Sequence, residues 1–261
     1  MITKWSEGDA DVNMDEDILV ELSRTIHRHP WWRARANLTI ALLKRLGVNR
    51  SARVLDAGCG WGVTLGLLER CGYRADGLDI SRRALDQLDR PGRLLIEADL
   101  AQPLADRFEP YDAVLALDVI EHLDDDRVPV ANLGQLARPG GVVVISVPAL
   151  PELFTEFDAI QGHRRRYLPE SLRSAFVGSG LEVERLFWWG AWLVPLLRRQ
   201  RRRTRSQPGA TASEIYSRYL HLPPWPLPWL LRVAFAVEQP PALAGALTTG
   251  TSLFAVGRKL E

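Results

Sequence analysis

Cysteine is nearly absent from this chain, and its scarcity limits the kinds of protein the chain can be. Of 261 residues only Cys59 and Cys71 are cysteines, too few for a zinc cluster or a disulfide framework. No apolar run reaches the roughly 20 residues that a membrane span needs. Acidic residues at positions 9, 11, 15, 16 and 17 are unlike a secretory signal peptide. We therefore expect a cytoplasmic protein.

Net charge is small as well. A formal charge of +1 provides no overall attraction to nucleic acid, and no separate RNA-binding module is visible, so we expect no nucleic-acid partner. Hydrophobic residues make up 46% of the chain and charged residues 25%, which is enough to bury a sizeable core. Nothing in the sequence requires a metal ion.

Strand and helix patterns alternate through the middle of the chain, which is typical of a parallel sheet with helices on both faces. We predict an α/β, doubly wound, Rossmann-like sheet of seven strands, in which the last strand is antiparallel. The expected helices are 62–71, 81–89, 127–138 and 169–179. The expected strands are 53–57, 75–80, 93–98, 111–117, 141–147, 181–187 and 252–258.

Two regions fall outside this core. Residues 15–46 show one or two apolar helical patterns, so we expect an N-terminal helical cap over residues 1–48. The Rossmann-like core then comprises 49–187 together with 251–261. Residues 188–250 form an apolar and basic insertion before the last strand.

The most informative motif begins at the end of the first core strand. Asp56-Ala57-Gly58-Cys59-Gly60 has the form D-x-G-x-G, and Asp79 follows about 20 residues later at the end of the next apolar run. Glycines at a strand end let the backbone approach a ligand closely, and an acidic residue at that distance binds ribose hydroxyls. The dinucleotide pattern G-x-G-x-x-G is not met, because its third glycine position is Val63.

This form resembles motif I of the class I S-adenosylmethionine-dependent methyltransferases. Further blocks resemble a bacterial type 11/12 methyltransferase group, and together they cover almost the whole chain. They include a Gly-His-Arg-Arg-Arg-Tyr block at Gly162–Tyr167, a His-Pro-Trp-Trp segment leading to Arg35, and the segments 118–125, 138–149 and 250–253. The resemblance implies the methyltransferase fold and S-adenosyl-L-methionine as cofactor.

Candidate cofactor residues follow from this assignment. Asp79 would accept bonds from both ribose hydroxyls, Asp99 from the adenine amine, and Asp56 would hold the ligand's ammonium. The resemblance favours Arg35 as the partner of the methionine carboxylate, while Trp31 and Trp32 either cover the sulfonium or pack in the core. A single strand-end acid is often only a turn residue, but four in succession favour a site. The remaining candidates are Gly58, Gly60, Ile80, Leu100, Leu117 and Asp118.

Candidate catalytic residues lie after the fourth and fifth core strands. His163 is the preferred general base, beside arginines that would hold an anionic substrate; His122 is either a second candidate or a residue that orients the loop. Tyr167 completes the candidate set. If the acceptor were a carboxylate or an amine, positioning alone would be sufficient, without a base.

The insertion raises three alternatives. Segments 187–205 and 225–237 place tryptophans and leucines beside arginines, a composition suited to peripheral contact with an anionic membrane. A hydrophobic lid and a homodimer interface are equally consistent with it. A basic, aromatic entrance would suit an anionic, lipid-linked acceptor.

We therefore predict a methyltransferase that transfers a methyl group by in-line displacement to a small or lipid-linked metabolite, with oxygen as the favoured acceptor atom. Two alternatives remain open at this point. One is a non-catalytic nucleotide-binding regulatory protein with a Rossmann-like domain, and the other is an NAD-dependent oxidoreductase, which the D-x-G-x-G spacing disfavours.

Overall fold

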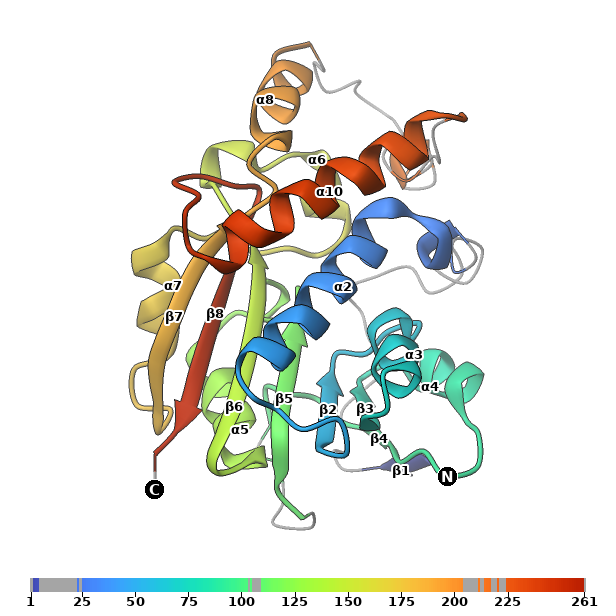
Figure 1. Ribbon diagram of the computed structural model, residues 1–261, viewed down its shortest axis with the longest axis vertical. Coiled ribbons are helices and arrows are strands. Elements are labelled where there is room, and N and C mark those ends of the chain that lie inside the picture. Colours follow the sequence, from blue (N-terminus) through green and yellow to red (C-terminus); the bar gives the residue numbers. More distant parts are fainter. Residues whose placement is uncertain are drawn as a thin grey trace.

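The structure is a computed structural model that describes residues 2–4, 23, 25–102, 104, 109–203, 211, 214–216, 220 and 224–260. These residues form an open eight-stranded sheet with helices on both faces (Figure 1). The strands are β1 (Ile2–Lys4), β2 (Arg53–Ala57), β3 (Arg74–Asp79), β4 (Leu95–Glu97), β5 (Tyr111–Leu117), β6 (Ala137–Pro148), β7 (Leu181–Trp189) and β8 (Ser252–Lys259). The helices are α2 (Pro30–Arg45), α3 (Val63–Arg70), α4 (Arg82–Leu88), α5 (Arg127–Leu136), α6 (Glu156–Ile160), α7 (Pro169–Ala175), α8 (Leu193–Arg203) and α10 (Leu227–Leu243), with short 3₁₀ helices η1 (Ile120–His122) and η2 (Pro151–Leu153).

The strand order is β1-β4-β3-β2-β5-β6-β8-β7, and only β8 runs against its neighbours. The predicted doubly wound sheet and the antiparallel last strand are confirmed. The order reverses between β2 and β5, which pair in parallel. In a doubly wound sheet, ligands bind outside the carboxyl ends of the strands at this switch point.

The predicted strand count of seven is wrong. Residues Ile2–Lys4, assigned to the helical cap, form an edge strand parallel to β4. Three residues are too few to show a periodic pattern, and their partner lies more than 90 residues away. Of the helical patterns expected in 15–46, the second is α2; most of the first lies outside the described residues.

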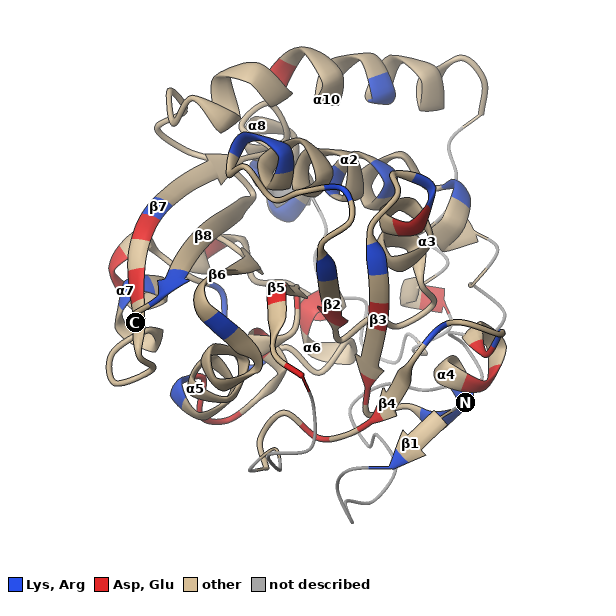
Figure 2. Ribbon diagram, turned by 60° about the horizontal axis from the view of Figure 1, so that its bottom comes forward, with Lys and Arg blue, Asp and Glu red and all other residues tan. Residues whose placement is uncertain are grey.

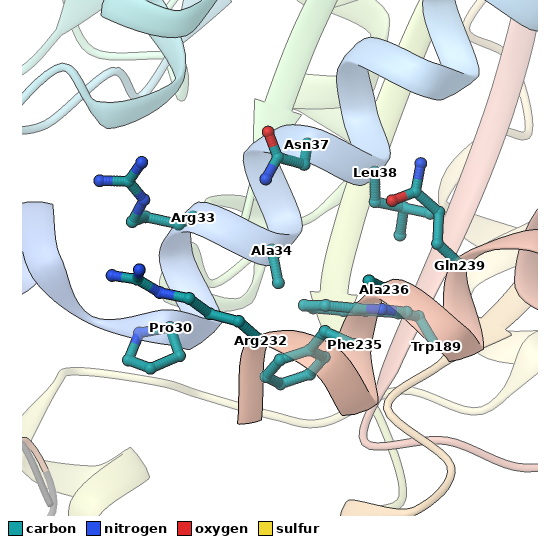
Figure 3. A pocket seen from close by; sticks show the side chains of 10 residues that line it. All are labelled: Pro30, Arg33, Ala34, Asn37, Leu38, Trp189, Arg232, Phe235, Ala236 and Gln239. Atoms are coloured by element: carbon teal, nitrogen blue, oxygen red, sulfur yellow. The ribbon is translucent and has the colours of Figure 1, made fainter. Parts of the chain in front are cut away.

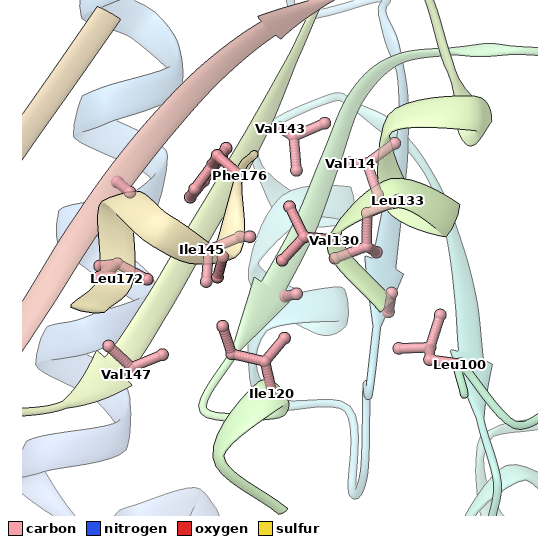
Figure 4. Packing of buried hydrophobic residues seen from close by; sticks show 14 of the residues in the cluster. Leu100, Val114, Ile120, Val130, Leu133, Val143, Ile145, Val147, Leu172 and Phe176 are labelled. Atoms are coloured by element: carbon pink, nitrogen blue, oxygen red, sulfur yellow. The ribbon is translucent and has the colours of Figure 1, made fainter. Parts of the chain in front are cut away.

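The core consists of two layers separated by the sheet. Val143, Ile145 and Val147 of β6 are fully buried under α5 and α7 (Figure 4), whereas Val144 points to the opposite face, under α2, α3 and α10. Burial on both faces explains why the central strands β5 and β6 contain continuous apolar runs instead of alternating ones.

The insertion begins later than expected and lies over the edge of the sheet where the parallel strands end. β7 continues to Trp189, which is 1% exposed and packs against Trp31 and Phe235 at centroid distances of 5.8 and 5.1 Å. α10 then packs alongside α2 (Figure 1). A cavity of about 160 Å³ remains between these helices, and Arg33 and Arg232 line it (Figure 3). None of the described helices is both long enough and apolar enough to cross a membrane.

Candidate active site

A cavity of about 520 Å³ lies at the carboxyl ends of β2, β5 and β6. Its floor is the glycine-rich loop after β2 together with the first residues after β5. One wall is the start of α2, and another is the loop around α6. The roof comes from the insertion, through α8, α10 and residues such as Tyr216 and Leu220. Residues of the insertion therefore form part of the cavity wall.

The glycine-rich loop is shaped for close approach by a ligand. Gly60 has φ +46°, and a Cβ added there would meet no atom within 4 Å, so its free face opens into the cavity that it lines. Gly58 serves a different purpose, because a Cβ there would collide with Val119. The backbone N–H of Gly60 donates to Asp79 Oδ2 at 2.6 Å, and Asp79 Oδ1 accepts from the Ser81 N–H at 2.9 Å. Asp79 thus fixes the loop that follows β2.

Asp56 lines the cavity directly above the sheet. Burial raises the pKa of this carboxyl to about 7, with the Asp79 charge adding to the rise and the Arg35 charge opposing it. A cationic ligand group placed nearby would relieve that cost, because an opposite charge favours the ionised carboxylate.

Arg35 reaches from α2 to the end of β5. Its Nη1 donates to Asp118 Oδ2 and, at 3.3 Å, to the Leu117 carbonyl, and its guanidinium lies 4.9 Å from the Trp31 ring centroid. Asp118 has φ +58°, and Ser146 Oγ donates to its Oδ1 at 2.9 Å. Such left-handed backbone at a non-glycine residue is typical of functional sites. Arg35 Nε is buried without a hydrogen-bond partner, so one donor remains for a ligand.

Four of the predicted cofactor residues do not line the cavity: Asp79, Ile80, Asp99 and Leu100. They follow β3 and β4, the next two strands along the sheet. Asp99 Oδ1 accepts from the Ala101 N–H at 2.8 Å, and the carbonyl of the buried Leu100 accepts from Asn132 Nδ2 at 2.9 Å. The sheet thus places Asp99, Asp79, Asp56 and Asp118 at the ends of four neighbouring strands, as the sequence predicts. The six other cofactor candidates line the cavity.

Two histidines face the cavity from different strand ends. The rings of His122, in η1, and His163, after α6, meet edge to face with centroids 4.7 Å apart. His163 Nδ1 lies 3.1 Å from Asp158 Oδ1, and Arg166 forms an ion pair with the same carboxylate at 2.7 Å. Burial lowers the pKa of His122 to about 4, and the neighbouring His163 adds to that effect, so His122 is neutral at pH 7. A neutral imidazole can accept a proton or bind a cation.

Tyr167 does not belong with these groups. It is 1% exposed and does not line the cavity, and its hydroxyl donates to Asp126 Oδ2 at 2.9 Å. Burial and the Asp126 charge raise the pKa of Tyr167 well above its usual range. Its position does not support the predicted catalytic role. Among the adjacent arginines, Arg166 lines the cavity, whereas Arg165 donates to the Leu123 carbonyl at 3.0 Å and Arg164 pairs with Asp124 at 3.3 Å.

Sequence reasoning gave no role to two acidic residues at this end of the cavity. Asp158 is 1% exposed and accepts from both His163 and Arg166. Glu121 is fully buried, and neither of its carboxylate oxygens has a hydrogen-bond partner. For Glu121, the sequence signal that could have indicated a role is its position directly before His122 at the end of a strand. A solvent-exposed turn would otherwise be expected there.

Comparison with known proteins agrees with this geometry. Residues 31–186 match the family described as methyltransferase domain. A ubiquinone biosynthesis O-methyltransferase of Alkalilimnicola ehrlichii is 37% identical over 108 residues, which cover 39% of this chain and 43% of that relative. A malonyl-[acyl-carrier protein] O-methyltransferase of Enterobacter lignolyticus is 35% identical over 147 residues, 53% of this chain and 58% of the relative. The chain thus matches about half the length of these curated relatives.

Among solved structures, a Haloferax volcanii methyltransferase in complex with the Trm112 methyltransferase activator superposes with a TM-score of 0.57, covering 95% of each chain at 19% identity. This likeness shows the fold. Because the family match spans more than half of the sequence, the chain belongs to the class I S-adenosyl-L-methionine-dependent methyltransferases. S-adenosyl-L-methionine is accordingly its cofactor.

Proposed function

We propose that this protein is an O-methyltransferase that acts on a small or lipid-linked metabolite. The observation that carries the proposal is the cavity itself, in which a glycine-rich cofactor loop and a histidine pair face one another across β5. O-methyltransferases among the relatives support oxygen as the acceptor atom. A regulatory protein without turnover would need only the cofactor half of this site.

The residues at the loop end of the cavity fit the cofactor. The unpartnered Nε of Arg35 is suited to the methionine carboxylate, and the buried Asp56 to the ammonium. Gly60 leaves room for the ligand, and the Asp79 carboxylate, which is fixed at the end of β3, is the proposed acceptor of the ribose hydroxyls. Asp99, Ile80 and Leu100 extend the same edge toward the adenine. Each of these roles is a part of the proposal.

The cofactor supplies a methyl carbon bonded to a positively charged sulfur. When bound, it would supply this methyl group for in-line transfer to the acceptor oxygen, whose proton would pass to a base or to solvent. The protein must therefore hold the acceptor in line and manage one proton. His122 and His163 mark the position of the acceptor oxygen, because both line the cavity beyond Leu117 and Asp118. Positioning of this kind contributes several kcal/mol, up to about 7–11 in the best cases.

The far end of the cavity suits an apolar acceptor with an anionic group. Trp192, Leu193 and Leu197 line it from the insertion, and the cationic groups facing it there include Arg166 and Arg201. Figure 2 shows basic residues along α8 in blue. An aromatic or isoprenoid acceptor carrying a carboxylate or phosphate would match both features.

We further propose that α10 rests on an anionic membrane surface from which such an acceptor is taken. Trp229 and Val237 of α10 are exposed apolar residues, at 52% and 71%, and Trp225, just before the helix, is 78% exposed. Arg232 of α10 and Arg33 of α2 line the small cavity between these two helices. Tryptophans and arginines side by side are suited to the interface between headgroups and acyl chains. This arrangement would make the enzyme a peripheral protein of the cytoplasmic side.

Sedimentation with liposomes tests the membrane part of this proposal. The protein should pellet with phosphatidylglycerol vesicles and not with neutral ones, and Trp229→Ser should reduce the bound fraction. Val177→Ser is the control, because Val177 is also an exposed apolar residue, at 66% against 52% for Trp229, but lies after α7, away from α10. A Trp229→Ser effect on dimerisation, measured by light scattering, without an effect on vesicles would favour the homodimer interface instead.

A further inference from the structure

Among the acidic residues that the structure describes, Glu121 is buried with both carboxylate oxygens unsatisfied, since neither has a hydrogen-bond partner. Burial and the nearby Asp118 charge raise the pKa of Glu121 well above its usual range. A buried carboxyl without partners is costly, and native proteins retain one where it serves a ligand or a reaction.

Two histidines stand directly beside this carboxyl. One ligand atom from each of Glu121, His122 and His163 can be chosen so that all three lie within 4.8 Å of one another. Ligands bound about 2.1 Å from a common ion lie at most about 4.2 Å apart, so small side-chain rotations would close the set. Glu121 and His122 come from η1, whereas His163 comes from the loop after α6, so the fold brings them together across 41 residues of sequence.

The second nitrogens of the histidines are already engaged in the way that metal-binding histidines require. His163 Nδ1 meets Asp158 Oδ1 at 3.1 Å, which leaves Nε2 for a ligand. His122 forms a hydrogen bond with the backbone of Gln161. Carboxylate and carbonyl partners of this kind fix the ring orientation and strengthen the histidine as a ligand. Asp158 is itself held by the Thr155 N–H at 2.8 Å and by Arg166.

We propose that Glu121, His122 and His163 form a divalent-cation site of the zinc or manganese type in the wall of the cavity. Two nitrogens and one carboxylate favour such ions over calcium or magnesium, which prefer oxygen ligands. Asp118 is not a ligand in this arrangement, because its oxygens accept from Arg35 and Ser146. Three protein ligands leave a fourth position open, and His122 and His163 both face the cavity, so that position is accessible to the acceptor.

This inference rests on the proposed function and specifies how the site handles the acceptor's proton. A cation bound to the acceptor oxygen lowers the pKa of the hydroxyl, so the proton passes to solvent before the oxygen attacks the methyl carbon. His163 is then a metal ligand and not the general base. Arg35 and Arg166 lie near enough to Glu121 to lower its pKa, and their charges are offset by Asp118 and Asp158.

Cobalt(II) is the probe for the test, because its visible spectrum reports coordination. The full, untagged chain is treated with a chelator and titrated with Co²⁺. We expect one equivalent to bind with intense four- or five-coordinate absorption, and Zn²⁺ to displace it. Proton NMR of the wild-type cobalt form should show two strongly shifted, exchangeable ring N–H signals, one for each histidine. Their absence, or absence of stoichiometric binding, would overturn the proposal even if no variant folded.

Variants assign the ligands. Glu121→Gln and His163→Asn should each weaken Co²⁺ binding at least about tenfold, whereas the control His27→Asn, which changes an exposed histidine, should not. S-adenosylhomocysteine binding is measured on the same samples. If the nucleoside binds but Co²⁺ does not, or if Co²⁺ binds Glu121→Gln and His163→Asn as it binds the wild type, the cation site is refuted and the proposed methyltransferase stands. If Co²⁺ binds but the nucleoside does not, the failure belongs to the proposed function.

Discussion

The carboxylate of Asp79 accepts the backbone N–H of Gly60 at 2.6 Å, and this bond ties the end of β3 to the glycine-rich loop after β2. The residue proposed to bind the ribose therefore also fixes the loop that makes room for the rest of the ligand. Asp79 and Gly60 are 19 residues apart in sequence, and they meet because β2 and β3 are adjacent parallel strands with aligned ends.

Gly60→Ala should weaken cofactor binding more than it weakens the fold. Its φ of +46° lies in the left-handed region, where a side chain costs roughly 1–2 kcal/mol, and the added methyl group would occupy cavity space. Gly47→Ala is the matched control, because Gly47 has φ +75°, also has open space around it, and lies after α2 away from the cavity. Urea unfolding should show similar losses for both. Titration with S-adenosylhomocysteine should show a loss of affinity for Gly60→Ala alone, and equal affinities would contradict the assignment.

Arg35→Lys should weaken binding of the amino-acid part of the ligand and leave binding of the nucleoside part almost unchanged. Lysine cannot reproduce the planar guanidinium that bridges Asp118, the Leu117 carbonyl and a carboxylate. Affinity for S-adenosylhomocysteine should fall about tenfold or more, while affinity for methylthioadenosine, which lacks the amino-acid group, should change little. Arg33→Lys, on the exposed side of the same helix, serves as the control. Equal losses for both ligands would indicate a purely structural role.

Asp56 should make stability depend on pH. Its pKa is 3.8 as a free group and about 7 in the folded protein, so the folded state binds the proton more tightly. Folding then takes up a proton between these values, and stability falls as pH rises from about 4 to 7, by at most about 1.4 kcal/mol per pH unit for one group. Urea unfolding of the wild type and Asp56→Asn at pH 5, 6, 7 and 8 should give a difference that grows to pH 7 and then levels off. A constant difference would contradict the assignment.

The same carboxyl should couple cofactor binding to pH. If Asp56 must be ionised to meet the ligand's ammonium, binding releases a proton below pH 7. Affinity for S-adenosylhomocysteine should therefore rise between pH 5 and 7, approaching tenfold per unit, and the rise should be absent in Asp56→Asn. Calorimetry in two buffers of different ionisation enthalpy would detect the released proton directly. An equally steep rise in the variant would place the titrating group elsewhere.

Glu238 should hold the insertion onto the core. It is buried in α10, and its oxygens accept the N–H groups of Gly190 and Ala191, at 3.0 and 2.6 Å, just after β7. Glu238→Ala leaves two buried donors unsatisfied and should cost about 1–3 kcal/mol for each donor that remains dry. Gln239→Ala, at the neighbouring position, should cost less. Urea unfolding measures both, and equal losses would show that this contact does not secure α10.

Local sequence pattern was enough to predict which acidic residues follow the strands, because the ends of strands are visible in sequence. The carboxyl ends of β3, β2 and β5 bring Asp79, Asp56 and Asp118 together as expected. The short β1 was missed because its pairing with β4 depends on tertiary contacts. Tyr167 was misplaced because the loop sequence does not show which side chains turn inward, and this one turns toward Asp126.

Contacts between distant segments could not be predicted from the sequence, because they too depend on tertiary packing. The insertion reads equally well as lid, dimer interface or membrane contact, and only packing shows that Trp192 and Tyr216 help to enclose the cavity. Nothing in the sequence indicated a metal ion, because Glu121 and His163 are far apart in the chain and the burial of Glu121 emerges only in the folded structure.

Calorimetric titration of S-adenosylhomocysteine, with NAD as the competing ligand class, tests the central claim most directly. The wild type should bind S-adenosylhomocysteine and not NAD, and Asp79→Ala should weaken binding about tenfold or more through loss of the ribose contacts. Asp86→Ala, which removes an exposed carboxylate from α4, should leave the affinity unchanged. Absence of binding to the wild type, or a preference for NAD, would contradict the assignment of this cavity to S-adenosyl-L-methionine.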